Sequence, residues 1–92
     1  MTEQQRKLAR HALGLNGKRK MSYRNRFYAA TGDSDHAEWM AMMHAGQADR
    51  ATATAPLDCF WLTRKGAEMA LNKGEKLDPE DFPRQRERTH AD

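Results

Sequence analysis

The sequence predicts an α+β fold in which three helices pack against a small antiparallel sheet of two to three strands. Three segments combine helix-capping residues with apolar side chains at helical spacing, and the length and aromatic content of residues 59–63 are those of a strand. The expected order is helix, strand, helix, strand, strand, helix. Because the chain has 92 residues, we expect a single compact domain with a thin core over residues 1–74.

The first helix is predicted over residues 3–13. Thr2 is a favourable N-cap, and Gln5 stands three residues later, as in a capping box. Gly14 follows the last apolar position, where a glycine commonly ends a helix. The apolar residues of this segment share one stripe of the helix: Leu8, Ala9, Ala12 and Leu13.

Two further helices are predicted from the same signals. Asp35 is expected to cap the second helix, with Glu38 completing a capping box, and Gly46 is expected to end it. The third helix is expected over residues 64–72, capped by Thr63. The second helix has a broad apolar face made of Trp39, Met40, Met42 and Met43.

Three segments are candidates for strands. Residues 23–29 alternate in the manner of a strand, although two of their aromatic residues are four apart, which suits a helix capped by Ser22. Aromatic content and short length favour the strand. Residues 48–52 and 59–63 are expected to form a hairpin, whose first arm is weak because it has no large apolar side chain.

The C-terminal part of the chain is expected to follow the compact domain as an extended segment and a tail. Residues 75–83 contain two prolines and are predicted to be extended, with Leu77 and Phe82 available to hold the segment against the domain. Residues 84–92 are highly charged and poor in apolar side chains, which predicts a disordered tail.

Composition excludes several classes of protein. No apolar stretch reaches the roughly 18 residues of a membrane span, and the first residues lack the apolar run of a signal peptide. The single cysteine excludes an intrachain disulfide and a multi-cysteine zinc site. We therefore expect a cytoplasmic protein without membrane contact.

The sequence predicts no catalytic or metal site. The acidic residues of the segment 33–38 lack the glycine and glutamate spacing of a calcium loop, and helix capping accounts for two of them. None of the four histidines is paired with another at a zinc-ligand spacing. Cys59 begins an apolar strand, where a half-buried structural side chain is expected rather than a nucleophile. A non-enzymatic protein without a cofactor is the prediction.

Positive charge is concentrated at the N-terminal end. The net charge of +3 divides into +7 for residues 1–26, −4 for residues 27–63 and zero for residues 64–92. Such a concentration attracts phosphate or an acidic protein surface, although a solvated charged face is the simpler alternative. The predicted nucleic-acid-binding residues are Lys18, Arg19, Lys20, Arg24, Arg26, Arg64 and Lys65.

Neighbouring residues extend this N-terminal basic face. Arg6 and Arg10 are four apart and share one side of the first helix. Arg24 and Arg26 are expected on one face of the strand at 23–29. The aromatic residues that stack on bases if they are exposed are Tyr23, Phe27 and Tyr28.

A second group of candidate binding residues is apolar. Trp39, Met42 and Trp61 belong to a Met- and Trp-rich group that either fills the core or, if the small domain leaves it uncovered, binds a protein partner. A homodimer formed through this group is one such arrangement.

The second half of the domain carries a familiar arrangement. A helix ends at Gly46, a hairpin follows, and the last helix is entered through FWLTRKGA at residues 60–67. This resembles the C-terminal part of a winged-helix domain. A winged helix has two helices between its first strand and its wing, the second being the recognition helix. There is room for only one, so we expect a winged-helix-like hairpin without a recognition helix.

Three further motifs are spaced along the chain: ARHALGL at residues 9–15, SYRNRF at 22–27 and FWLT at 60–63. With them, the region 6–72 resembles a family of small uncharacterised bacteriophage and prophage proteins. The resemblance implies a phage origin, and therefore action in a host cytoplasm, and it implies no activity.

The sequence leaves two functional hypotheses. The first is an accessory or regulatory protein that binds nucleic acid through the N-terminal basic face. The second is a phage protein that binds and modulates a host protein, such as a defence or transcription complex. In the second, the basic face mimics or blocks a nucleic-acid contact, and the Met- and Trp-rich group supplies affinity.

Overall fold

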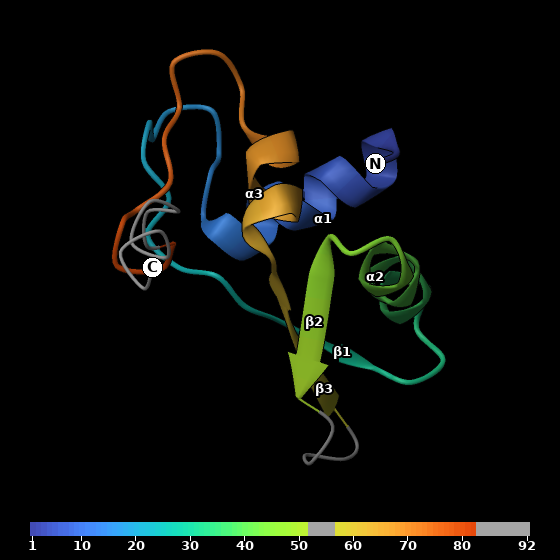
Figure 1. Cartoon of the computed structure of the whole chain (residues 1–92). Helices are drawn as coiled ribbons and strands as arrows, with labels where there is room; N and C mark the ends of the chain where they lie inside the picture. Colours follow the sequence, from blue (N-terminus) through green and yellow to red (C-terminus); the bar gives the residue numbers. More distant parts are fainter. Residues whose placement is uncertain (52–56, 83–92) are drawn as a thin grey trace.

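The computed structural model describes residues 1–51 and 57–82. Within them the chain forms three helices and a three-stranded antiparallel sheet (Figure 1). The elements are α1 (Glu3–Leu13), β1 (Phe27–Ala30), α2 (Ser34–His44), β2 (Ala48–Ala51), β3 (Leu57–Leu62) and α3 (Arg64–Ala70). The predicted α+β class and the order of its elements are confirmed.

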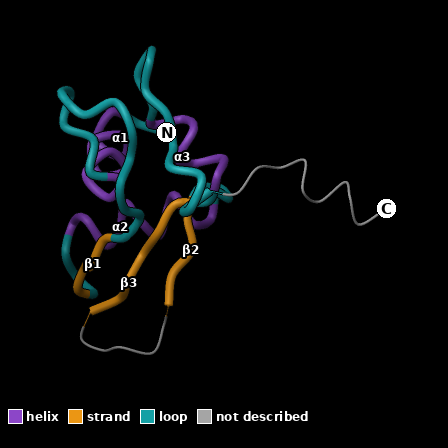
Figure 2. Tube along the Cα trace, turned by 90° about the vertical axis from the view of Figure 1, so that its left-hand side faces the viewer, coloured by secondary structure: helices purple, strands orange, loops and turns teal. Residues whose placement is uncertain are grey.

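The last strand of the chain lies at the centre of the sheet, whose order is β1-β3-β2. Phe27 pairs with Phe60, and Ala48 pairs with Leu62. Because strand residues alternate between two faces, these residues share one face with Ala29, and all but the half-buried Phe27 are buried. The helices cover this face. In Figure 2 the strands lie side by side, and no helix crosses in front of them.

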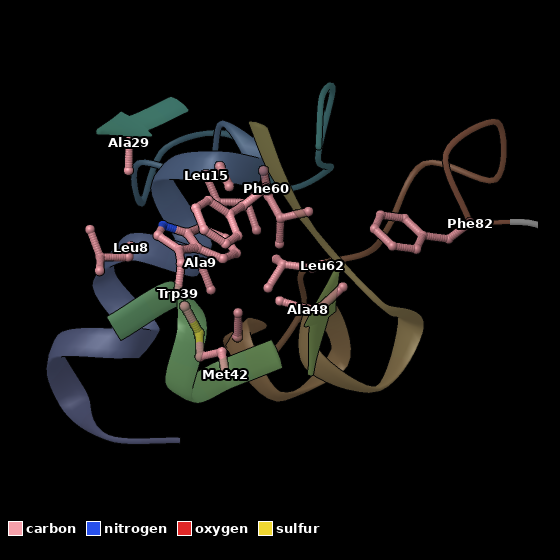
Figure 3. Close-up of a cluster of buried hydrophobic side chains, with 14 residues drawn as sticks. Leu8, Ala9, Leu15, Ala29, Trp39, Met42, Ala48, Phe60, Leu62 and Phe82 are labelled. Carbon is pink, nitrogen blue, oxygen red and sulfur yellow. The ribbon is translucent and has the colours of Figure 1, made fainter. Parts of the chain in front are cut away.

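Aromatic rings form the centre of the core. Trp39 of α2 stacks on Phe60 of β3 with ring centroids 5.6 Å apart, and the ring of Phe27 lies 5.5 Å from that of Trp39. Trp39 and Phe60 are completely buried. Figure 3 shows their side chains between Leu8 of α1 and Leu62 of β3. The core is therefore formed by side chains from α1, α2 and the sheet.

Helix α1 has the predicted bounds and the predicted caps. The Thr2 hydroxyl accepts a hydrogen bond from the Gln5 amide, and the Gln5 side chain accepts one from the Thr2 amide, which completes the capping box. Gly14 takes the left-handed conformation with φ of 80° that ends the helix.

Helices α2 and α3 differ from prediction at their ends. Asp33, not Asp35, is the N-cap of α2, and its side chain makes no capping hydrogen bond. Glu38 does not complete a capping box, because its Oε1 accepts a hydrogen bond from Gln5 Nε2 of α1. Helix α3 is capped by Thr63 as predicted, but it ends at Ala70, two residues early.

Strand β1 begins at Phe27, four residues later than predicted. The amides of Tyr23 and Arg26 donate to carbonyls of α1, Leu13 O and Ala12 O, so this stretch is held by the helix rather than by a neighbouring strand. Asn25 links this stretch to β3, because its side chain donates a hydrogen bond to Leu62 O and accepts one from Leu62 N. Residues 23–26 therefore belong neither to a helix nor to the sheet.

The hairpin of β2 and β3 is present, with β3 beginning two residues before the predicted Cys59. Thr52, predicted as the end of the first arm, lies outside the described residues. One helix, α2, separates β1 from β2. The second helix that a winged-helix domain places there is therefore missing, as expected.

Residues 75–82 return to the domain. The Lys76 amide donates a hydrogen bond to the Lys20 carbonyl, and the Lys76 carbonyl accepts one from the Ser22 amide. The Ser22 hydroxyl accepts a third hydrogen bond, from the Asp78 amide. Phe82 is buried against the core. The predicted disordered tail, 84–92, lies outside the described residues.

Candidate nucleic-acid interface

A hydrogen-bonded turn presents the three cations that follow α1. The Asn16 side-chain oxygen accepts hydrogen bonds from the amides of Lys18 and Arg19, at 3.0 and 3.2 Å, which fixes the turn. The side chains of Lys18, Arg19 and Lys20 are exposed. Local backbone chemistry therefore projects this run of positive charge into solvent.

Tyr23 lies between two of the arginines. The guanidinium carbons of Arg19 and Arg24 are 4.4 and 5.2 Å from the centroid of its ring. The ring also lies directly against Gly14, where an added Cβ would be 2.1 Å from the Tyr23 Cε1 atom. Glycine at this position is thus required both by the left-handed turn and by the aromatic ring. Tyr23 remains 50% exposed.

Arg24 and Arg26 do not share a strand face, because both precede β1. Arg24 is half-buried and donates from Nη2 to the carbonyl of His11 at 2.8 Å, while its buried Nε has no partner. Arg26 is exposed. We use the name basic cluster for the predicted cations that lie in or beside the 16–26 segment: Lys18, Arg19, Lys20, Arg24 and Arg26.

No cation of the basic cluster forms an ion pair with a described residue. Among the described residues, the arginines in ion pairs are Arg10, Arg50 and Arg64, none of which belongs to the cluster. No carboxylate of those residues lies within 4.0 Å of a cluster cation. Arg24 is held by the His11 carbonyl and the charge of Lys20 acts on Glu75, so the exposed cations Lys18, Arg19 and Arg26 are the most open to a polyanion.

Arg6 and Arg10 are not available to a ligand, contrary to their predicted place on the basic face. Arg10 forms a two-pronged ion pair with Glu75, at 2.5 and 2.8 Å, and donates to the carbonyl of Ala70 at 2.9 Å. Arg6 donates to the carbonyl of Leu71 and to the side chain of Asn72. Both guanidinium groups stabilise the C-terminal end of α3.

The ion pair with Arg10 changes the pKa of the Glu75 carboxylate. Its pKa is lowered from 4.5 to about 2, chiefly by the hydrogen bonds from Arg10, and its burial opposes this shift. A hydrogen bond from the Asn72 amide and the charge of Lys20 lower it further. The same ion pair raises the pKa of Arg10.

Arg64 and Lys65 occupy a different place from the basic cluster. Arg64 forms an ion pair with Glu68 at 3.3 Å, donates to the carbonyl of Phe82 and lies over its ring. Lys65 donates to the carbonyl of Ala45 at 3.3 Å. Both cations help to hold α3 against its neighbours, which leaves the basic cluster as the candidate site.

Trp39 and Met42 are wrong as partner-binding residues. Both are completely buried, because α2 turns its apolar side against the sheet and α1. The alternative that they fill the core is correct. Trp61 is half-buried and lies on the opposite face of the sheet from Phe60.

The sequence interpretation missed a buried polar group around Asp58. Its Oδ2 lies 2.7 Å from His36 Nε2 and 3.0 Å from Arg50 Nη1. The hydrogen bond with His36 lowers the pKa of Asp58, and the ring of His36 packs edge-on against Phe60. A signal was present, since Asp58 has the strand parity of buried Phe60 and so needed a partner. Across residues 1–51 and 57–82, no group of three or more His, Cys, Asp or Glu is placed to hold a metal ion.

Comparison with known proteins supplies no relative. No family model matches the chain, and no curated protein and no solved structure matches it either. None of the helices in the described part of the chain has the length and apolar character needed to cross a membrane.

Proposed function

We propose that the chain binds nucleic acid through the basic cluster, in an accessory or regulatory role. The observation that carries this proposal is a set of five cations close together in the sequence, none of them in an ion pair with a described residue, of which Arg19 and Arg24 lie over the half-exposed ring of Tyr23. Phosphate oxygens suit the guanidinium and ammonium groups, and an aromatic ring among cations suits a base. The resemblance to phage proteins adds the expectation of action in a host cell.

Salt dependence is the signature of this mode of binding. Each phosphate contact releases bound counterions, so the logarithm of the binding constant falls linearly with the logarithm of salt concentration. Five contacts to a single strand predict a slope of about −3.5, because each contact contributes roughly −0.7. This slope can be measured by fluorescence anisotropy with labelled single-stranded and duplex oligonucleotides. The salt concentration is varied between about 50 and 200 mM, a range in which such slopes are resolved.

Charge removal inside and outside the cluster gives the matched comparison. The double variant Lys18→Ala/Arg26→Ala should make the slope shallower by about 1.4, since two contacts are lost. Lys7→Ala/Lys73→Ala removes the same charge from exposed positions outside the cluster and should leave the slope unchanged. No binding by the native chain at low salt, or equal losses in both double variants, would reject the proposal.

The alternative of a host-protein modulator has less support among the assigned residues. Two of the three side chains assigned to affinity, Trp39 and Met42, lie in the core, and the third, Trp61, is half-buried. Its remaining feature, the basic cluster, serves nucleic-acid binding directly.

A further inference from the structure

One face of the sheet is left without a covering helix. Its residues have the opposite strand parity from the core residues and, by the register, lie side by side on the three strands. Figure 2 views the sheet with its strands side by side, and helices lie behind or beside them. We call these residues the open face: Tyr28, Ala30, Leu57, Cys59, Trp61, Asp49 and Ala51.

The open face is apolar and aromatic. Tyr28 of β1 is 57% exposed and Leu57 of β3 is 43% exposed, and Cys59 and Trp61, which follow Leu57 on the same face of β3, are half-buried. Tyr28 pairs directly with Cys59, and Trp61 lies on the same face two residues farther along β3, diagonal to Tyr28. Two aromatic rings are thus presented on one side of a rigid sheet.

A cation stands at the end of this face. The register pairs Phe27 with Phe60, and the Asn25 side chain bonds to both backbone groups of Leu62. Continuing the register by one residue therefore sets Arg26 level with Trp61. Arg26 also belongs to the basic cluster, so it connects the cluster in the sequence to the edge of the open face.

We propose that the open face stacks the bases of single-stranded nucleic acid on Tyr28 and Trp61, while Arg26 and the basic cluster hold its phosphates. The inference rests on the proposed function and names its substrate class. Aromatic rings on an open sheet face stack two or three bases in other single-strand binders. A duplex keeps its base faces inside the stack, so it cannot use these rings.

Charge favours a polyanion on the β1 side of this face. The carboxylate of the face, Asp49, pairs with Trp61 from β2, whereas Arg26 lies level with Trp61 on the β1 side, so the phosphates are expected along β1 and away from Asp49.

The chain provides two reporters of the open face. Cys59 is the only cysteine, so its alkylation rate with iodoacetamide reports on the centre of this face. Of the two tryptophans, Trp39 is buried and Trp61 is partly exposed, so quenching of fluorescence by a bound base reports on Trp61. A single-stranded DNA oligonucleotide should slow the alkylation and quench the fluorescence, and a duplex of the same sequence should do neither.

Variants separate stacking from other contacts. Tyr28→Thr and Trp61→Leu should each weaken single-strand binding roughly 5- to 150-fold, the range for loss of one stacked aromatic, and leave duplex binding unchanged. Leu57→Thr, on the same face, and Met69→Ala, at an exposed apolar position of α3, should change single-strand binding less than twofold. Circular dichroism establishes that each variant is folded.

Three outcomes overturn the inference in distinguishable ways. If the native chain binds no oligonucleotide, the proposed function fails with it. If oligonucleotides bind with the predicted salt slope but Tyr28→Thr and Trp61→Leu bind as tightly as the native chain, the proposed function stands and the stacking face is wrong. If Cys59 becomes protected with rising protein concentration alone, and Leu57→Thr removes that protection, the face binds a second copy.

Discussion

At the scale of single residues, Gly66 shows how closely α3 approaches the end of α2. A Cβ atom at this position would lie 2.0 Å from the backbone carbonyl oxygen of Gln47. The same oxygen accepts the Thr63 amide at 3.1 Å, and Thr63 caps α3. The backbone of residue 47 therefore cannot withdraw without breaking the contact that starts the helix.

Gly66→Ala is expected to destabilise the chain although alanine is the better helix former. Helix propensity favours alanine by about 1 kcal/mol, whereas the backbone overlap requires a shift that costs about 3 kcal/mol. The free energy of unfolding should fall by about 2 kcal/mol, measured by urea denaturation. Met69→Ala, an exposed change in the same helix, should alter it by less than about 0.5 kcal/mol. A more stable Gly66→Ala would show that the approach is not rigid.

Residues whose roles depend on near neighbours were predictable, and residues with distant partners were not. Thr2, Gln5 and Gly14 act within one helix and were identified from spacing alone. Arg10 was placed on a binding surface because nothing near it in the sequence reveals that Glu75 will pair with it. Trp39 was ambiguous for the same reason, since burial depends on which elements cover it.

At the scale of elements, α3 depends on side chains from α1. It has seven residues, which is too short to be stable alone. Its last carbonyls accept hydrogen bonds from Arg6 and Arg10, and Glu75 holds Arg10 in place. The ion pair therefore acts as a C-terminal cap that is assembled from three parts of the chain.

The Glu75 ion pair predicts a dependence of stability on pH. Because folding lowers the pKa of Glu75 from 4.5 to about 2, its contribution is complete above pH 4.5 and is lost as the pH falls toward 2. Glu75→Gln should reduce the free energy of unfolding by about 3 kcal/mol at pH 7. Urea denaturation at several pH values between 7 and 2.5 should show the two proteins converging in acid.

Glu80→Gln provides the control for this experiment. It removes one carboxylate from an exposed position in the same segment, so its effect should be small at every pH. Asp58 also has a lowered pKa, but it is present in both proteins and cancels in their difference. A difference between the native chain and Glu75→Gln that stays constant down to pH 2.5 would contradict the role of the ion pair.

The late start of β1 has the same kind of explanation. The alternation of residues 23–29 predicts a strand, but only its last three residues join the sheet. What decides membership of the sheet is the partner of each amide. Tyr23 and Arg26 donate to the end of α1, which no pattern within the segment reveals.

At the scale of the whole molecule, the sequence sufficed for the class and order of the elements but not for the two faces of the sheet. Caps, glycines and apolar periodicity are local, so the six elements were found. The exposed side of the sheet depends on which face three helices cover, and that choice is made by packing. Tyr28 and Trp61 were accordingly considered separately in the sequence, whereas the fold brings them onto one surface.

The segment 75–82 makes stability a property of the whole chain. It bonds to the 20–22 segment through Lys76, and it buries Phe82 against the core. Since a domain of this size has a thin core, the removal of one buried ring should be felt throughout the molecule. Phe82→Ala is therefore expected to cost about 3 kcal/mol and to lower the melting temperature by roughly 12 to 24 °C.

Two signals measured together test this expectation. Helical circular dichroism reports on α1 and α2, and tryptophan fluorescence reports on the environment of buried Trp39. Both should shift to the same lower temperature in Phe82→Ala, because the segment and the core unfold as one unit. Asp81→Ala changes an exposed neighbour and should leave both transitions in place. An unchanged melting temperature in Phe82→Ala would mean instead that residues 75–82 can detach without destabilising the core. The ion pair of Arg10 with Glu75 would then stabilise only the contacts of this segment.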